Sequence, residues 1–311
     1  MKAYQLNKVG LEEPLQLIEL EIPQPKENEV LIKTKFFSIN PVDLKTRMGL
    51  GVYGRIKTES PLILGWDISG EVVAIGSQVN DLKVGDEVFG MVNFPGHGKV
   101  YAEYVSAPED HLAIKPGNIS HEEAAASTLA AMTAYQVFVK NLNIGDSVLI
   151  HAGAGGVGHF AIQMAKIFGA HVIATASSKN EDFVKSLGAD QVIDYTQTDF
   201  TKACHDVDFV LDMMSGDVLV RSIEIVKNGG KIVSLPSGLS NEIKESGKHK
   251  NVQIDFQLVE SSVADMAQIA AWLTSKKIIP HVSQNFEFNE IELAHRQVYS
   301  GKTRGKIVVS A

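Results

Sequence analysis

The stretch "VLIHAGAGGVGHFAIQMAK" spans residues 148–166 and sets a cluster of glycines between two segments of regular pattern. The apolar run before the glycines is typical of a strand, and the run after them has helical spacing. The glycines match G-x-G-x-x-G, a pattern that allows a tight turn, the approach of a pyrophosphate and close packing of helix on strand. A purely structural turn is the alternative. The cofactor contacts predicted in this turn are Gly153, Ala154, Gly155, Gly156, Val157 and Gly158.

This turn follows the first of six apolar strands that alternate with helical segments, and this context favours dinucleotide binding. The predicted strands are SVLIHA (147–152), HVIATA (171–176), QVIDY (191–195), DFVLDMM (208–214), KIVSLP (231–236) and VQIDFQLV (252–259). Alternation of this kind indicates a parallel, doubly wound sheet, for which six strands are the usual complement. The alanine-rich segment 120–140 has helical character.

The first part of the chain has a different texture from this α/β region. Short β-rich segments broken by proline and glycine fill roughly the first 120 residues, with one helical turn expected at residues 41–49. The tail returns to helix, strand, helix and strand. We therefore predict a β-dominated, barrel-like part in addition to the α/β part.

Composition excludes several classes of function. A formal charge of −8 and a pI near 5.7, with no basic stripe, argue against nucleic acid or an anionic membrane as a partner. No run approaches the roughly 18 apolar residues of a membrane span, and the N-terminus lacks the apolar core of a signal peptide. The single cysteine, Cys204, rules out an internal disulfide and a multi-thiolate zinc site. We expect a cytoplasmic protein.

The segment after the second strand of the α/β part predicts which nicotinamide cofactor binds. NAD-binding proteins carry an acid near the end of that strand, where this chain has Ala176, and no acid follows before Glu181. Two hydroxyls and an ammonium group stand there instead and suit a 2′-phosphate. The alternative is that this segment merely caps the following helix. The residues predicted to hold the phosphate of NADPH are Ser177, Ser178, Lys179 and Tyr195.

Several motifs together resemble the medium-chain dehydrogenase/reductase superfamily, and within it the zinc-independent quinone oxidoreductase branch related to zeta-crystallin. These motifs are INPVDLKTRMG (39–49), LGWDISGEVVAIG (64–76), LKVGDEVFG (82–90), AAMTAYQ (130–136), HAGAGGVG (151–158), LGADQVIDY (187–195) and GKTRGKIVV (301–309). The resemblance implies a partly open, GroES-like β-barrel domain (1–121 and 261–311) into which a Rossmann NADPH-binding domain (122–260) is inserted.

The zinc enzymes of this superfamily carry a cysteine ligand where Ile39-Asn40-Pro41 stands here and a His-Glu pair where Trp66-Asp67 stands. The resemblance therefore implies that no metal is bound. Zinc polarises an alcohol or carbonyl oxygen, so its absence argues against simple alcohol oxidation. Transfer of hydride to a conjugated quinone or enone needs less assistance, because conjugation spreads the developing charge.

The resemblance also suggests residues for catalysis. Asn40 and Asp43 match positions that line the substrate cleft, Tyr53 follows on a glycine-rich loop, and Thr133 matches a threonine near the nicotinamide; Pro236 is a further expected cofactor contact. Structural roles are the alternative, with Asp43 capping a helix and Asn40 holding the turn before a proline. Asp67 is predicted to be structural.

We therefore predict an NADPH-dependent reductase of quinones or similar conjugated carbonyl compounds. One alternative is reduction of the C=C bond of α,β-unsaturated aldehydes or ketones. A second alternative is a non-catalytic, crystallin-like NADPH-binding protein.

The segment 251–262 is predicted to form an exposed sheet edge, which favours a homodimer.

Overall fold

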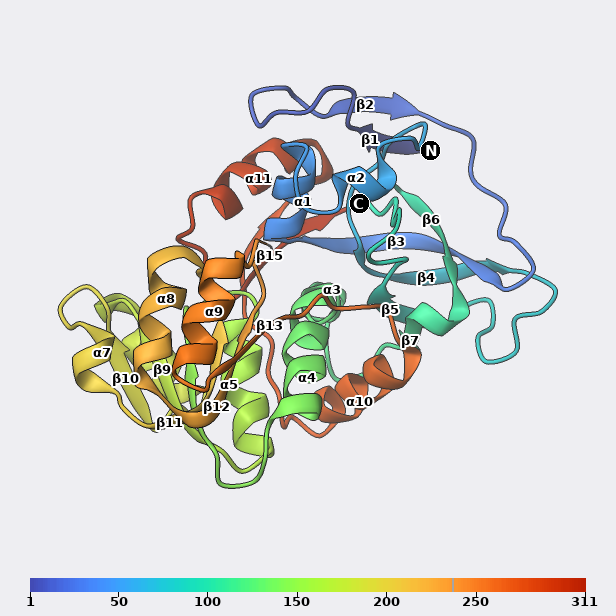
Figure 1. The fold of residues 1–311 in the computed structure, drawn as a ribbon. Coiled ribbons are helices and arrows are strands. Elements are labelled where there is room, and N and C mark those ends of the chain that lie inside the picture. The colour runs from blue at the N-terminus through green and yellow to red at the C-terminus, as the bar shows by residue number, and fades with distance from the viewer. Residues whose placement is uncertain (237) are drawn as a thin grey trace. The chain divides into compact units, whose positions relative to one another are not determined.

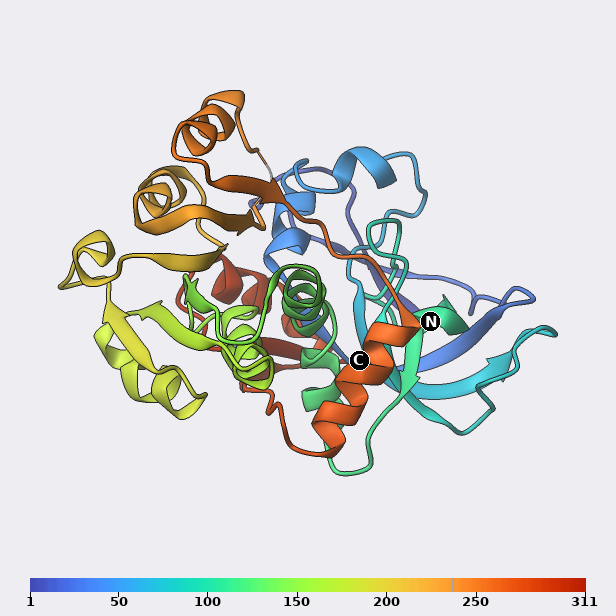
Figure 2. The ribbon, with the colours of Figure 1, turned by 60° about the horizontal axis from the view of Figure 1, so that its bottom comes forward.

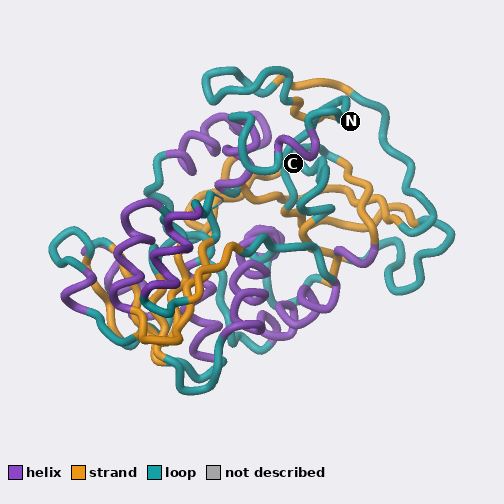
Figure 3. Tube along the Cα trace, in the orientation of Figure 1, coloured by secondary structure: helices purple, strands orange, loops and turns teal. Residues whose placement is uncertain are grey.

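The computed structural model describes residues 1–236 and 238–311, which form two compact units. The first unit combines Met1–Met132 with Val259–Ala311, and the second unit is Thr133–Leu258. The chain leaves the first unit once and returns to it with its tail (Figures 1 and 3).

The second unit is built on a six-stranded sheet in the order β10-β9-β8-β11-β12-β13, and every neighbouring pair is parallel. The strands are β8 (Ser147–Ile150), β9 (His171–Ala176), β10 (Gln191–Asp194), β11 (Val207–Asp212), β12 (Val226–Ser234) and β13 (Gln253–Phe256). Numbered within the unit, this order is 3-2-1-4-5-6, the doubly wound order of dinucleotide-binding domains. The predicted α/β fold class and its six parallel strands are confirmed.

Helices connect these strands and cover both faces of the sheet. They are α5 (Gly158–Ile167), the 3-10 turn η2 (Ser178–Asn180), α6 (Glu181–Ser186), α7 (Phe200–Ala203), α8 (Gly216–Ile225) and α9 (Asn241–His249). Figure 2 shows α8 and α9, in orange tones, on one face and α5, in yellow-green, on the other. The direction of winding reverses between β8 and β11, and in such sheets ligands bind outside the carboxyl ends of the strands at this point.

The first unit contains a seven-stranded sheet centred on β3, an eleven-residue strand. Its path runs β14-β15-β3-β4-β5-β7, with β6 also paired to β3, and all pairs are antiparallel except β14 with β15. These strands are β3 (Glu29–Ile39), β4 (Asp67–Ile75), β5 (Glu87–Met91), β6 (Tyr104–Pro108), β7 (Leu112–Ile114), β14 (Val282–Phe286) and β15 (Lys306–Ser310). A separate hairpin-like pair joins β1 (Lys2–Gln5) to β2 (Gln16–Glu19).

Short helices complete the first unit. They are α1 (Pro41–Arg47), α2 (Tyr53–Ile56), η1 (Glu109–His111), α3 (His121–Ala126), α10 (Val263–Thr274), η3 (Phe288–Glu290) and α11 (Ile291–Tyr299). A further helix, α4 (Leu129–Asn141), starts in the first unit and continues into the second. No helix among the described residues combines the length and apolar character that crossing a membrane requires.

The helical segment 120–140 is two helices rather than one, interrupted at Ser127 and Thr128. The Ser127 hydroxyl donates to the carbonyl of Glu123 at 2.7 Å, so it competes with the backbone for a helical acceptor. The N–H of Leu129 donates instead to Oδ1 of the buried Asp67 at 2.9 Å. A tertiary contact therefore breaks a helix that composition alone favours.

Candidate functional site

The turn between β8 and α5 presents free backbone N–H groups at the carboxyl edge of the parallel sheet. Within the described residues, the N–H groups of Ala154, Gly156 and Val157 have no hydrogen-bond acceptor. The N–H of Gly155, in contrast, donates to the carbonyl of Ala152 at 2.9 Å. Free N–H groups just before a helix N-terminus form a favourable site for phosphate. The turn therefore fits the pyrophosphate of a dinucleotide.

The glycines of this turn have different surroundings. A Cβ atom on Gly158 would lie 2.3 Å from the carbonyl oxygen of Ala152, so this position needs glycine for close packing. A Cβ atom on Gly155 would meet only that oxygen, at 3.2 Å, and otherwise faces open space. Ala152, the residue just before Gly153, has a left-handed backbone, with φ 50°.

The ends of β9 and β10 bring the residues predicted for the 2′-phosphate close together. Ala176 and Asp194 are register partners of the parallel pair, and the N–H of Tyr195 donates to the carbonyl of Ala176 at 3.1 Å. Tyr195 is 60% exposed, and Ser178 and Lys179 are also exposed at the start of the next turn. The structure thus places these side chains at one edge of the sheet.

Capping does not account for the polar side chains of this segment. Ser177 is the N-cap of η2 and Asn180 is the N-cap of α6, yet neither makes a side-chain capping bond. Asn180 instead donates its side-chain amide to the Ser177 hydroxyl at 3.3 Å. The alternative explanation that these residues serve only to cap α6 has no support in these contacts.

Asp194 is an acid that the sequence analysis did not connect with this segment. Its carboxylate accepts a hydrogen bond from the hydroxyl of Ser178, from both the N–H and the hydroxyl of Thr196, and from the side chain of Gln197. The bond from Ser178 is the main reason why the pKa of Asp194 is lowered to about 2. Asp194 follows Ser178 by 16 residues, so only strand pairing brings the two together.

The loop after β11 also lies at the carboxyl edge of the parallel sheet, and the sequence analysis did not include it among the site residues. Asp212 is buried at the end of this strand and accepts hydrogen bonds from the N–H of Met214 at 2.9 Å and from the hydroxyl of Ser234 at 2.7 Å. Ser215 has a φ of 60° in this loop. The sequence signal was a Ser-Gly pair just after a strand. Pro236, predicted as a cofactor contact, lies two residues beyond the end of β12.

In the first unit, Asn40 belongs to a buried polar cluster around Asp67. The side-chain amide of Asn40 donates to Oδ2 of Asp67 at 2.7 Å, and the ammonium group of Lys306 donates to the Asn40 oxygen. Ser38 and Lys306 also donate to Oδ2 of Asp67, at 2.5 and 3.4 Å. All four side chains are buried, and burial lowers the pKa of Lys306. The structural role predicted for Asp67 agrees with these contacts, and substrate contact by Asn40 stays a prediction.

Asp43 occupies a second buried cluster beside the first. Its Oδ2 accepts the backbone N–H of Asn40 at 2.7 Å, which is the capping contact considered as the alternative, and the hydroxyl of Tyr101 at 3.0 Å. Oδ1 has no partner among the described residues, and burial raises the pKa of Asp43 to about 7. Tyr101 also lies 3.0 Å from Nε2 of His295, whose Nδ1 is 3.2 Å from the guanidinium of Arg47. Substrate contact by Asp43 therefore stays a prediction.

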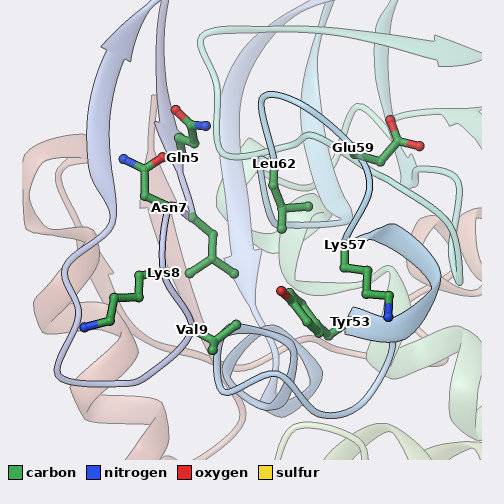
Figure 4. A pocket seen from close by; sticks show the side chains of 9 residues that line it. Gln5, Asn7, Lys8, Val9, Tyr53, Lys57, Glu59 and Leu62 are labelled. Carbon is green, nitrogen blue, oxygen red and sulfur yellow. The ribbon is translucent and has the colours of Figure 1, made fainter.

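Tyr53 and Thr133 belong to different units of the chain. Tyr53 begins α2 and is half-buried at a pocket of about 210 Å³. Figure 4 shows its ring directed toward Val9 and Leu62, with Lys57 beside it. Thr133 is buried on α4. Joint action of the two residues stays a prediction.

The residues at the positions of the zinc ligands do not fit zinc. The ammonium group of Lys306 contacts the carbonyl of Ile39, the amide oxygen of Asn40 and the carboxylate of Asp67. Zinc in proteins is held mainly by thiolate and imidazole, whereas these groups are oxygen donors around a resident cation. Among the described residues, no group of three or more His, Cys, Asp or Glu side chains is arranged to hold a metal.

Two family models match the chain. A model described as "Alcohol dehydrogenase GroES-like domain" matches residues 26–117, which confirms the GroES-like part of the predicted fold. A model described as "Zinc-binding dehydrogenase" matches residues 187–309. Both matches agree with the fold class, while the donor set at Asn40 and Asp67 does not suit the metal in the second description.

A curated relative and solved structures are similar to nearly the whole of this chain. The 2-methylene-furan-3-one reductase of Solanum lycopersicum is 35% identical, with 99% of this chain and 79% of that protein covered. The quinone oxidoreductase of Coxiella burnetii is 39% identical, with a TM-score of 0.94 and 100% and 99% of the two chains covered. The quinone oxidoreductase of Escherichia coli, solved in complex with NADPH, is 27% identical, with a TM-score of 0.89 and 100% of each chain covered.

Proposed function

The chain belongs to the medium-chain dehydrogenase/reductase superfamily, in its quinone oxidoreductase-like branch, and we propose that it uses NADPH to reduce quinones or similar conjugated carbonyl compounds. It is an NAD(P)H oxidoreductase of this superfamily. The choice of NADPH, the class of acceptor and the residues that act are our proposals.

The observation that carries the proposal is the turn between β8 and α5. The free N–H groups of Ala154, Gly156 and Val157 supply donors for a pyrophosphate, and Gly155 leaves room for it. At the neighbouring strand ends, Lys179 supplies a cation, and the Ser177 hydroxyl and the exposed phenol of Tyr195 supply donors for a 2′-phosphate. This set of donors supports NADPH as the cofactor.

In the proposed reaction, the protein positions its ligands and excludes water while the hydride is transferred; protonation follows that transfer. The hydride for the conjugated acceptor comes from NADPH when it is bound, and solvent supplies the proton that completes the reduction. Thr133 orients the nicotinamide end, and Tyr53 forms a wall that shields the acceptor. Asn40 and Asp43 hold the start of α1 through their buried contacts, which keeps the segment leading to Tyr53 in place.

A panel of acceptors tests this function. Purified protein is assayed for oxidation of NADPH and NADH with a quinone, an open-chain enone and a saturated ketone. We expect turnover with the quinone, faster with NADPH, and none with the saturated ketone. Activity that a chelator removes together with stoichiometric zinc contradicts the metal-free mechanism. Binding of NADPH without any turnover favours the non-catalytic alternative.

Reduction of a C=C bond is the second candidate. The tomato relative, 35% identical along almost the whole chain, is by its name a reductase of a 2-methylene-furan-3-one, in which a C=C bond is conjugated to a carbonyl group. Product analysis distinguishes the candidates, because reduction of an enone at carbon yields a saturated ketone. A kcat/KM for enones above that for quinones establishes this candidate as the main activity.

We also propose the homodimer that the sequence predicts. β13 lies at one edge of the six-stranded sheet, where a second copy can extend the sheet. Sedimentation of the purified protein as a dimer supports this assembly, and a monomer at all accessible concentrations contradicts it.

A further inference from the structure

The carboxylate of Asp194 lies at the edge of the sheet where the proposed 2′-phosphate site is. Asp194 ends β10 opposite Ala176, which ends β9, and parallel neighbours lie about 4.8 Å apart. In proteins that bind NAD, the acid that accepts the ribose hydroxyls stands at the end of the second strand, at the place of Ala176. The chain therefore supplies an acid near this place from the neighbouring strand.

The hydrogen bond between Ser178 and Asp194 changes what Ser178 can offer a ligand. A serine hydroxyl has a single proton to donate, and that of Ser178 is donated to the Asp194 carboxylate. The oxygen of Ser178 also accepts the side-chain amide of Gln197 at 3.2 Å. Ser178 consequently has no proton left for a phosphate oxygen, although the sequence pattern makes it a phosphate donor.

The charge of Asp194 persists at every pH at which the enzyme would work. The bonds from Ser178 and Thr196 lower its pKa to about 2, so the carboxylate is ionised near neutrality. Asp190, another exposed acid of this unit, forms an ion pair with Lys166. Among the described residues, no cation forms an ion pair with Asp194, whose partners are neutral donors. A negative group therefore faces the site together with the cation of Lys179.

We propose that Asp194 is a specificity-determining residue that weakens the preference for NADPH and lets the protein also accept NADH. The proposal rests on the proposed dinucleotide site of the second unit. Asp194 acts in two ways: its charge repels a 2′-phosphate, and it engages the proton of Ser178. A ribose 2′-hydroxyl, in contrast, can donate to this carboxylate as it does to the acid of NAD-binding proteins. Lys179, Ser177 and Tyr195 oppose the repulsion.

Direct binding of NADPH and NADH, followed by nucleotide fluorescence, tests the proposal without depending on turnover. Asp194→Asn keeps the size of the side chain and removes its charge, and we expect NADPH to bind about threefold to tenfold more tightly. NADH should bind equally well or more weakly. Asp182→Asn is the matched control, because it removes one negative charge from an exposed residue of the adjacent α6. The control should leave the ratio of the two affinities within about twofold.

A second variant separates the two effects of Asp194. In a Ser178→Ala background no hydroxyl is available to turn toward the phosphate, so only the charge effect of Asp194 remains. Asp194→Asn should then give a smaller gain in NADPH affinity, and this gain should be lost at high salt because salt screens the repulsion. In the wild-type background, part of the gain should survive salt, because Ser178 becomes a donor to the phosphate.

An unchanged NADPH-to-NADH ratio in a folded Asp194→Asn variant overturns the proposal, as does an equal change in the Asp182→Asn control. A loss of NADPH affinity in Ser178→Ala as large as that in Lys179→Ala also overturns it, because Ser178 would then donate to the phosphate. If the wild-type protein binds neither nucleotide, the proposed function itself fails. If it binds both but the ratio of affinities does not change in Asp194→Asn, only the role of Asp194 fails.

Discussion

Asp67 and Asp194 are two carboxylates that each accept several hydrogen bonds, one in each unit of the chain. Asp67 is fully buried, with Lys306 as its cationic partner, whereas Asp194 is partly exposed and bonded to neutral donors. Burial makes every lost contact of Asp67 costly, because no water can replace it. At the exposed site of Asp194, water can replace lost contacts. Changes at this cluster should therefore alter ligand affinity more than the free energy of unfolding.

The largest expected effect is that of Asp67→Ala. The change leaves the buried ammonium group of Lys306 without its counter-ion and frees the hydroxyl of Ser38, which should cost about 3–5 kcal/mol of unfolding free energy. Urea unfolding followed by circular dichroism measures the loss. Asp194→Ala, measured in the same way, should cost far less; similar losses for the two variants contradict the contrast between the sites.

The pH dependence of stability should also differ between a buried and an exposed acid. Burial raises the pKa of Asp43 to about 7, above the value of about 3.9 of an unfolded chain. Between these values the folded state holds a proton that the unfolded state has released, so this contribution is complete below about pH 4 and is lost as the pH rises through 7. The stability of Asp43→Asn relative to the wild type should therefore increase from pH 5 to pH 8.

Two other groups define the control for this measurement. His295, whose pKa burial lowers to about 3, gives the wild type an opposite slope below about pH 6.5, so only the difference between wild type and variant reports on Asp43. Asp194 has a pKa lowered to about 2, so its contribution is lost only as the pH falls below about 4. The Asp194→Asn variant should therefore run parallel to the wild type from pH 5 to pH 8. A parallel course for Asp43→Asn contradicts the prediction.

Tyr101→Phe removes a single hydroxyl from the buried cluster around Asp43 and so tests how much this hydroxyl contributes to stability. The hydroxyl lies 3.0 Å from both Oδ2 of Asp43 and Nε2 of His295, and its removal leaves both groups buried with a partner lost. We expect a loss of about 1–3 kcal/mol in unfolding free energy. The midpoint of urea unfolding measures this, and a stability equal to that of the wild type contradicts the role of Tyr101 as a bridge.

Lys179→Ala should change the free energy of unfolding least among these variants. Its main effect should be on nucleotide binding. Loss of one partly solvated ionic contact should weaken NADPH binding about tenfold and NADH binding little. The preference for NADPH should also shrink as the salt concentration rises, because screening weakens an exposed contact. A full NADPH preference in a folded Lys179→Ala variant shows that the 2′-phosphate binds elsewhere.

Local pattern was sufficient to predict the fold class and the glycine-rich turn between the first strand and the first helix of the parallel sheet. Strand and helix periodicity, together with the glycines at 153, 155 and 158, predicted the six parallel strands and the strand-to-helix turn that the structure shows. These features depend on residues that are close in sequence, so the chain itself reports them. Close packing requires glycine at Gly158, as the pattern predicted, because a Cβ atom there would lie 2.3 Å from the carbonyl oxygen of Ala152.

Contacts between distant residues were decided only by the tertiary structure. The break between α3 and α4 depends on Asp67, which lies 62 positions before Leu129, and the state of Ser178 depends on Asp194, 16 positions after it. The sequence determined which polar groups the chain carries. Strand pairing and burial decided which of them meet, which are shielded from water and which stay available to a ligand, because the energy of a polar group depends on its partners and on its access to solvent.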